Sequence, residues 1–481
     1  MKKIIPILIL GLIIYLSGCK LGPDFQRAEY NGPDAFRFDT ITTDTIVNLR
    51  WWELFNDPDL DTLIKIALIE NKDVLIAAAR IEASRANLGM TKAGQWPSFG
   101  YSAGAGGGNF GAGQLSSTNL SNFSAYPEMY WEIGFWGKYR RMNESAQAEL
   151  LASEYGMRTI QISLISAVAS TYFSLLEFKT KLEISKNTLA SRDAGLTIIQ
   201  ARFDYGIVPE IDLNQAQIQK AISQAAVPIY TRAIAITESS LSILLGRSPS
   251  DVITNAPLID QQTPPKVPEG LPSQLLLRRP DIQQAEQLYA AQNAKIGIAQ
   301  AMRWPSLNVT GLLGYASNDL TSLTTGGLAW AAAGSITGPI FQFGKNKRRV
   351  EIERANTVAA LMEYEYTTLR AFKEVEDALI TIKTLHEELI AQEVRNNAAI
   401  NAEYLSGERY DKGQTSYLEV LESQRQSFDA QLQYTQTQRE LLDAHISLYK
   451  SLGGGWLSPE EEQAYLEAKA AAEAEAEANN N

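Results

Sequence analysis

The sequence carries a long internal duplication, and this feature constrains the fold more than any other. Up to the first strands, matching residues recur at a constant offset of 208 positions: Asp73 and Asp281, Gly89 and Gly297, Trp96-Pro97-Ser98 and Trp304-Pro305-Ser306. Further along the offset is 207, in Gly137-Lys138 and Gly344-Lys345, Arg202 and Arg409, Gly206 and Gly413, Leu245-Gly246 and Leu452-Gly453. A register kept over roughly 170 residues predicts two structurally equivalent halves.

Each half predicts the same order of elements. A helix comes first, over 73–95 or 281–303, and Trp-Pro ends it because proline disfavours a helical conformation in the residue before it. Two strands follow, and then a helical hairpin that turns at Gly206 or Gly413. The helix before each turn has about 68 proline-free residues, roughly 100 Å at 1.5 Å per residue. Its apolar residues step by three or four, as in a coiled coil.

The duplication sets the predicted organisation of the chain. The expected segments are a signal peptide over 1–18, a lipidated N-terminal and equatorial segment over 19–72, a first repeat over 73–247, a Pro-rich equatorial linker over 248–280, a second repeat over 281–453 and an acidic low-complexity tail over 454–481. The strand pairs are expected within 98–135 and 306–341, with solvated loops over 109–122 and 317–327. The tail combines few large apolar residues with many glutamates, so a frayed helix or disorder is expected there.

The strand pairs leave two interpretations open. Trp131, Ile133 and Phe135 share one face of a strand pattern, and Glu132 and Gly134 share the other. Such segments fit soluble hairpins packed on the helices. They also fit transmembrane strands that turn apolar side chains toward lipid, with aromatic residues at the membrane interfaces. The aromatic candidates are Tyr101, Tyr126, Tyr130, Trp131, Trp330 and Phe341.

Membrane geometry adds a condition to the second interpretation. An open sheet edge is not tolerated in lipid, and the smallest membrane barrels have about eight strands. Four strands per chain therefore require copies of the chain to pool their strands. Two copies would supply about eight strands with a filled interior, and three would supply about twelve, enough to leave room for a channel.

The N-terminus resembles a bacterial lipoprotein signal. Lys2 and Lys3 precede an apolar run over 4–16, which is shorter than the roughly 20 residues of a membrane-spanning helix. The run ends in Leu16-Ser17-Gly18-Cys19, which resembles a lipobox. That resemblance implies cleavage before Cys19 and acylation of this residue. The alternative is a buried cysteine behind an uncleaved anchor.

Composition argues against a nucleic-acid-binding protein and against a metal-dependent or nucleotide-dependent enzyme. A formal net charge of −12 is unfavourable for nucleic-acid binding, which needs clustered cations. The chain has two histidines, His386 and His445, and one cysteine, so a Cys/His zinc cluster and an intrachain disulfide are not expected. Gly104 to Gly108 lacks the lysine of a phosphate-binding loop. The sequence therefore predicts no enzyme, no metal site and no cofactor other than the covalent lipid on Cys19.

Several motifs resemble one family. They are the run Leu276-Leu277-Arg278-Arg279-Pro280-Asp281-Ile282, the run Asn293 to Gly297, the mature start Cys19 to Phe25, Trp131-Glu132-Ile133 before Gly137-Lys138, and Gly338-Pro339-Ile340-Phe341. Over about residues 19–456 the chain resembles the outer-membrane efflux channels of TolC/OprM type, in their lipoprotein branch.

The resemblance implies an α+β membrane protein. In it, a homotrimer forms a twelve-stranded β-barrel with four strands per chain, continued by a long periplasmic α-helical barrel with an equatorial mixed region. It implies an exit duct for small molecules such as drugs, lipid-anchored in the outer membrane of a Gram-negative bacterium and extending into the periplasm. The implied partners are further copies of the chain, outer-membrane lipid, a periplasmic adaptor protein and an inner-membrane pump of RND type, without nucleic acid.

The resemblance also implies a gate at the periplasmic end. Its acidic residues correspond to Glu419 and Glu422, six and nine positions after Gly413, and to Asp212, six after Gly206. Tyr410 corresponds to a tyrosine of the closed-state hydrogen-bond network. The tips Gly206 and Gly413 would contact the adaptor.

At the gate, one position departs from the family pattern. Thr415 stands where the family's best-known member has an arginine, so an arginine–carboxylate contact is not expected from that position. The alternative for the acidic residues is that they are ordinary solvated charges on a helix surface.

Other functions stay open at this point. A structural periplasmic coiled-coil lipoprotein would explain the helices and Cys19 but not the duplicated aromatic strand pairs. The same channel fold would also serve metal efflux or type I protein secretion.

Overall fold

The computed structural model describes residues 20–28, 37, 50–111, 114–261, 263–264, 278–325 and 327–454. The predicted signal peptide 1–18, the lipidation residue Cys19, much of the linker and the tail beyond 454 lie outside these residues. The chain divides into two compact units. Unit 1 comprises 1–30, 79–155 and 283–366, and unit 2 comprises 31–78, 156–282 and 367–481.

Unit 1 contains an antiparallel sheet of four strands in the order β1-β2-β3-β4. The strands are β1 Ser98–Gly111, β2 Gln114–Ile133, β3 Ser306–Ser317 and β4 Leu328–Thr337. The central pairing of β2 with β3 joins the two sequence repeats and places Glu132 opposite Asn308. β1 and β4 each pair on one side only within the described part of the chain, so the sheet has two open edges.

The expectation of a loop over 109–122 is wrong. β1 continues to Gly111 and β2 begins at Gln114. Strand pairing uses backbone N–H and C=O groups, so small and polar residues extend a strand once a neighbouring strand supplies partners. Residue type alone therefore underestimated the length of this hairpin.

The expected strand ends at Phe135 and Phe341 are also wrong. β2 ends at Ile133, and β4 ends at Thr337. Gly338-Pro339 follows β4 directly, and proline lacks the N–H that would continue the ladder.

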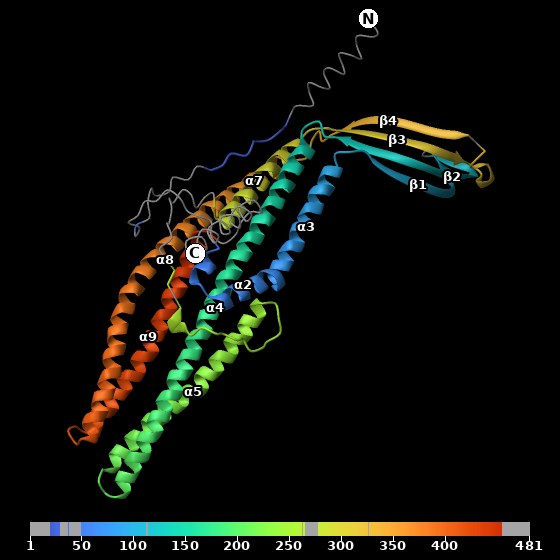
Figure 1. Ribbon diagram of the computed structural model, residues 1–481. Helices are drawn as coiled ribbons and strands as arrows, with labels where there is room; N and C mark the ends of the chain where they lie inside the picture. Colours follow the sequence, from blue (N-terminus) through green and yellow to red (C-terminus); the bar gives the residue numbers. More distant parts are fainter. Residues whose placement is uncertain are drawn as a thin grey trace, which may run out of the picture. The chain divides into compact units, whose positions relative to one another are not determined.

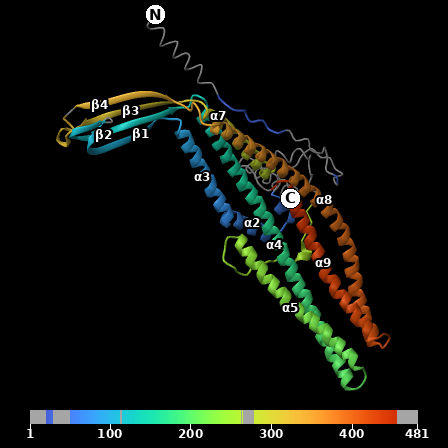
Figure 2. The ribbon, with the colours of Figure 1, turned by 180° about the vertical axis from the view of Figure 1, so that it is seen from behind.

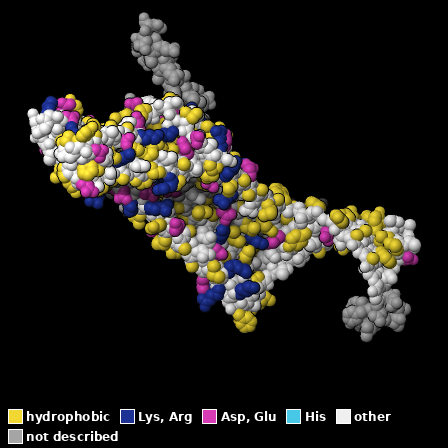
Figure 3. All heavy atoms as spheres, turned by 90° about the horizontal axis from the view of Figure 1, so that it is seen from below, with side chains coloured by type: hydrophobic (Ala, Val, Ile, Leu, Met, Phe, Trp, Pro, Cys, Tyr) yellow, Lys and Arg dark blue, Asp and Glu magenta, His cyan; other side chains and the backbone are white. Residues whose placement is uncertain are grey.

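The sheet presents large apolar side chains to its surroundings. Figure 3 shows mostly hydrophobic and uncharged side chains over the visible face of the sheet, and most of the charged ones over the helices. Among the strand side chains that the structure describes, Phe99, Tyr101 and Trp330 are each more than 70% exposed. Soluble sheets rarely leave so much apolar surface uncovered.

Helices make up most of the remaining structure. They are α2 Pro58–Glu70, α3 Lys72–Ala93, α4 Lys138–Asp204, α5 Glu210–Leu244, α7 Pro280–Ala301, α8 Lys345–Asp411 and α9 Tyr417–Ser451, with short 3-10 turns η1 Trp51–Phe55, η2 Leu258–Asp260 and η3 Leu320–Ser322. The corresponding helices of the two repeats have equal lengths, 67 residues in α4 and α8 and 35 in α5 and α9. Figures 1 and 2 show α5 returning along α4, and α9 returning along α8.

One described helix, α4, contains a stretch long and apolar enough to cross a membrane. Inside the protein, 56% of that stretch is buried. Its side chains Val168, Tyr172 and Phe173 belong to the main hydrophobic cluster of unit 2, together with Trp51 and Phe55 of η1. The apolar stretch is therefore accounted for as a core helix.

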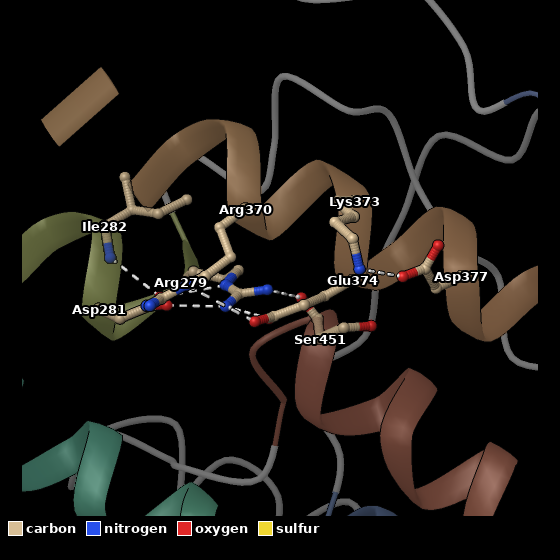
Figure 4. A network of polar contacts seen from close by, with 8 residues as sticks. All are labelled: Arg279, Asp281, Ile282, Arg370, Lys373, Glu374, Asp377 and Ser451. Carbon is tan, nitrogen blue, oxygen red and sulfur yellow. Dashed lines mark hydrogen bonds and ion pairs between the residues drawn. The ribbon is translucent and has the colours of Figure 1, made fainter. Parts of the chain in front are cut away.

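Within unit 2, a buried arginine joins the start of α7 to α8 and α9 (Figure 4). Arg279, 6% exposed, donates to both carboxylate oxygens of Asp281 at 3.0 and 2.7 Å. It also donates to Glu374 of α8 at 2.7 Å and to the carbonyl of Ser451 at the end of α9 at 2.9 Å. The run Arg278 to Ile282 thus has a physical role: it fixes the start of α7 against both helices of the second hairpin.

Candidate functional site

The two hairpin tips, both in unit 2, have the same backbone geometry. Gly206 and Gly413 have φ of +70° and +71°, the left-handed conformation that glycine adopts most readily. After α4, the N–H of Ile207 donates to the carbonyl of Arg202 at 2.8 Å. After α8, the N–H of Gln414 donates to the carbonyl of Arg409 at 2.9 Å. These bonds satisfy the last helix carbonyls, as in a Schellman motif, and explain why each helix ends there.

Glu419 lies in the first turn of α9 and reaches back across the second tip. Its Oε1 accepts a bond from Arg409 Nη1 at 2.6 Å, and its Oε2 accepts one from the hydroxyl of Thr415. An arginine–carboxylate contact is therefore present at this tip, but the arginine is Arg409, four residues before Gly413. No pattern in the sequence pairs these two residues, which are ten positions apart on different helices.

Glu422 lies one turn further along α9. It makes two bonds with Arg425, at 2.7 and 3.0 Å, and accepts a third from Gln426 at 2.7 Å. Hydrogen bonding to Arg425 and Gln426 lowers the pKa of Glu422. The side chains of Glu419 and Glu422 are 42% and 49% exposed, so both carboxylates remain accessible to ions in this single chain.

Tyr410 belongs to an aromatic cluster at the tips. Its ring lies 5.4 Å from that of Tyr417, and the guanidinium of Arg202 lies 4.9 Å from the ring centre of Tyr410. Both tyrosines pack on a small apolar cluster made of Ile199, Leu213 and Ala216. The two hairpins therefore contact one another at their tips.

Asp212 lies in the first turn of α5, close to this cluster. Burial, with contributions from Tyr410 and the carboxylate of Asp212, raises the pKa of Tyr417 to about 12. The structure thus brings Asp212 and Tyr410 near one tyrosine that sequence reasoning missed. The position of Tyr417 at the start of α9 was the available signal, because an aromatic residue there faces the neighbouring hairpin.

Arg192 of α4 was missed as well. It is 4% exposed, and it donates to the carbonyls of Gln219 in α5 at 2.8 Å and Gln424 in α9 at 3.5 Å. Its guanidinium lies 5.1 Å from the ring centre of Phe428. Burial lowers the pKa of Arg192. This side chain connects the two hairpins about three to four helical turns from the tip. Its bond to α9, the helix that carries Glu419 and Glu422, links the charges at the tip to the packing of the hairpins.

The site offers charge and hydrogen bonding rather than covalent chemistry. Among the residues that the structure describes, no group of three or more His, Cys, Asp or Glu side chains is placed to hold a metal ion. The tips hold two helical hairpins together by bonds that are individually weak and accessible to water.

Comparison with known proteins identifies the class to which this fold belongs. The family model "Outer membrane efflux protein" matches residues 63–247 and 271–454, one match for each repeat. The solvent efflux pump outer membrane protein SrpC of Pseudomonas putida is 34% identical over 460 residues, covering 92% of this chain and 97% of SrpC. The cation efflux system protein CusC of Escherichia coli is 32% identical over 459 residues, covering 92% and 96%.

Solved structures give the same result. The CmeC outer membrane channel of Campylobacter jejuni superimposes with a TM-score of 0.84 at 25% identity, covering 94% of this chain and 98% of that one. The open state of the MtrE outer membrane channel of Neisseria gonorrhoeae has a TM-score of 0.82 at 27% identity, covering 91% and 98%. The chain belongs to the outer membrane efflux protein family, which confirms the resemblance found in its motifs.

Proposed function

We propose that this protein is the outer-membrane exit duct of a tripartite efflux system. In this proposal three chains form one channel, anchored by acylated Cys19 and by a shared β-barrel. A periplasmic adaptor binds the hairpin tips around Gly206 and Gly413. An inner-membrane pump of RND type delivers small organic molecules, which leave through the channel.

The open edges of the sheet carry the proposal. A four-stranded sheet with apolar side chains on its surface and unpaired edges at β1 and β4 is unstable in lipid, where unpaired backbone groups cost several kcal/mol each. Pairing β4 of one copy with β1 of the next removes both edges. Three copies then supply about twelve strands, the number compatible with an open channel.

An exposed stripe on α5 supports association between copies. Six isoleucines separated by four or seven residues are each 46–63% exposed: Ile211, Ile218, Ile222, Ile229, Ile236 and Ile243. Residues at that spacing lie on one helix face, and an uncovered stripe of large apolar side chains marks a helix–helix interface. We assign the stripe to packing against a neighbouring copy.

Aromatic residues support the position of the sheet in the membrane. At one end of the sheet, Trp96 and Trp304 each lie two residues before a strand, and Trp136 and Phe341 lie three and four residues after strands. Tryptophan at the level of the lipid headgroups is typical of membrane proteins. We assign this end to the periplasmic interface, because the helical hairpins follow it.

The tips are proposed as the gate. In a trimer, Glu419 and Glu422 would each form a ring of three carboxylates, and such rings favour cations in a narrow pore. Arg409 and Thr415 would hold Glu419 in place, and Asp212 with Tyr410 would hold the neighbouring hairpin. Contacts that are exposed and weak suit a gate, because an adaptor can replace them at small cost.

Bilayer recordings test the channel and the gate together. Wild-type protein should migrate as an SDS-resistant trimer and form cation-selective channels in planar bilayers. Glu419→Gln with Glu422→Gln should abolish cation preference without loss of the trimer. The matched control, Glu387→Gln with Glu388→Gln on α8, removes the same charge away from the tips. Unchanged reversal potentials in both double variants would place the gate elsewhere, and absence of any channel from the wild type would contradict the function.

The proposed cargo is an organic molecule such as a solvent or antibiotic. Relatives named for solvent, toluene and antibiotic efflux match over 92–93% of this chain. The cation efflux relative CusC supports metal export as the alternative. Expression with each kind of pump and adaptor in a host that lacks its own channel distinguishes them. Restored resistance to toluene but not to metal cations is the expected outcome.

A further inference from the structure

Unit 1 contains a cavity of about 330 Å³ where the sheet meets the helices. The ends of β2 and β4 and the starts of α4 and α8 line it, together with the α7–β3 connection. Two stacked rings, Trp136 and Trp304, form part of the wall with centroids 4.8 Å apart. Trp136 Nε1 donates to the carbonyl of Pro305 at 2.7 Å, which fixes the indole in place.

The charged side chains of the cavity do not cancel. Four of them line it: Glu132, Lys138, Lys345 and Arg349. Glu132 pairs with Lys138 at 3.0 Å. Arg349 Nη1 donates to Asn346 Oδ1 at 3.1 Å, and in the described part of the chain neither Arg349 nor Lys345 forms an ion pair. The cavity therefore keeps two positive charges available for an anion.

The start of α8 concentrates further positive charge. Lys347 and Arg348 lie between the two cavity cations in the sequence and share the single carboxylate of Glu351. The first turn of α8 has no acidic residue, and cations at a helix N-terminus oppose the helix dipole. This placement is unfavourable in an isolated chain and becomes favourable when an external anion lies beside it.

A strongly apolar segment lies directly before these cations. Ile340, Phe341 and Phe343 are 102%, 73% and 91% exposed, although they are among the bulkiest apolar side chains. The rings of Phe341 and Phe343 lie 4.6 Å apart. Apolar side chains next to clustered lysine and arginine are typical of surfaces that enter the headgroup and acyl boundary of a membrane.

We propose that the cavity binds the phosphate of a phospholipid from the periplasmic leaflet of the outer membrane. Lys345 and Arg349 contact the phosphate oxygens, and Trp136 and Trp304 border the headgroup. Ile340, Phe341 and Phe343 contact the acyl chains. The assignment rests on the proposed membrane position of the sheet, which puts this cavity at headgroup depth.

Lipid binding to the purified full-length protein tests the assignment. Native mass spectrometry of detergent-solubilised trimer, titrated with dioleoylphosphatidylglycerol, counts bound lipids. Lys345→Gln with Arg349→Gln should weaken lipid binding at least tenfold. The control, Lys65→Gln with Lys383→Gln, removes two exposed cations elsewhere and should bind lipid as the wild type does. Inorganic phosphate at equal concentration should not displace the lipid, because it lacks acyl chains.

Each alternative outcome overturns the proposal. Equal lipid binding in the cavity variant and the control would show that these cations do not hold lipid. Displacement by inorganic phosphate would make the site a free-anion site. Dissociation of the variant trimer would identify the segment as an interface between copies. Channel conductance is measured separately, so a conducting variant with unchanged lipid binding removes this proposal and leaves the proposed function intact.

Discussion

Arg279→Met is expected to destabilise unit 2 far more than removal of a similar but exposed arginine. In the folded protein Arg279 makes two bonds to Asp281, one to Glu374 and one to the Ser451 carbonyl. Methionine keeps most of the side-chain volume but no donor. Asp281, whose side chain is only 17% exposed, then loses both arginine bonds and keeps only the N–H of Ile282 and the charge of Arg370.

The size of the effect follows from burial. Removing one partner of a buried ion pair costs about 3–5 kcal/mol, because the other charge stays desolvated. If the chain unfolds as one unit, its unfolding entropy is roughly 1 kcal/mol/K, so the expected fall in Tm is about 3–5 °C. Arg247 offers a matched control, because it also donates two hydrogen bonds to one carboxylate, that of Glu70, at 2.7 and 2.8 Å. Its side chain is 48% exposed, so water screens the pair and Arg247→Met should lower Tm far less than Arg279→Met.

The pH dependence provides a second measurement. Burial alone would raise the pKa of Asp281, but the bonds and charge of Arg279 lower it below 3.8. A carboxyl with a lowered pKa stabilises the fold above its unfolded pKa and loses that contribution as pH falls through the folded value. Without Arg279, burial should instead raise this pKa. The difference in stability between wild type and Arg279→Met should therefore shrink between pH 7 and pH 4.

Thermal unfolding followed by circular dichroism at 222 nm, in one detergent and at several pH values, measures both effects. Equal losses for Arg279→Met and Arg247→Met would refute the argument from burial. A gap between wild type and Arg279→Met that is constant with pH would refute the role of Asp281. Adding Asp281→Asn to Arg279→Met should recover part of the lost stability, because it removes the unpaired charge.

Three further outcomes are expected. Cys19→Ser should abolish metabolic labelling with palmitate and signal cleavage while leaving part of the protein in the membrane through the barrel; normal labelling would contradict the lipobox. Gly246→Ala should lower Tm more than Gly206→Ala, because a Cβ at Gly246 would lie 2.2 Å from the carbonyl oxygen of Glu70, whereas none of the described atoms lies within 4 Å at Gly206. Deletion of 306–341 should abolish SDS-resistant trimers, and a stable membrane-inserted trimer from it would contradict the pooled barrel.

The long helices and their turns were predictable because local rules determine them. Absence of proline allows α4 and α8 to propagate, and a glycine able to adopt positive φ ends each of them. Because of the duplication, the order of elements in one half could be predicted from that in the other. Strand ends were predicted less well, since Gly111 and Gln114 belong to strands only because a neighbour satisfies their backbone groups.

The residues proposed for the gate were likewise predictable only in part. The positions of Glu419 and Glu422 after Gly413 could be counted along the chain, and so could the missing arginine at Thr415. The pairing of Arg409 with Glu419 could not be predicted by counting positions, because the contact depends on the direction in which α9 leaves the turn.

The sequence by itself determined the family, the duplicated order of elements and the helix lengths, because each of these depends on residues close together in the chain or on repetition. Tertiary structure alone decided which distant groups meet. Arg192 joins three helices, Arg279 joins α7 to α8 and α9, and β2 pairs with β3 across more than 170 residues. A residue pattern specifies which side of a helix or strand is apolar or charged. It does not specify the partner, because that choice is made by the packing of whole elements against one another.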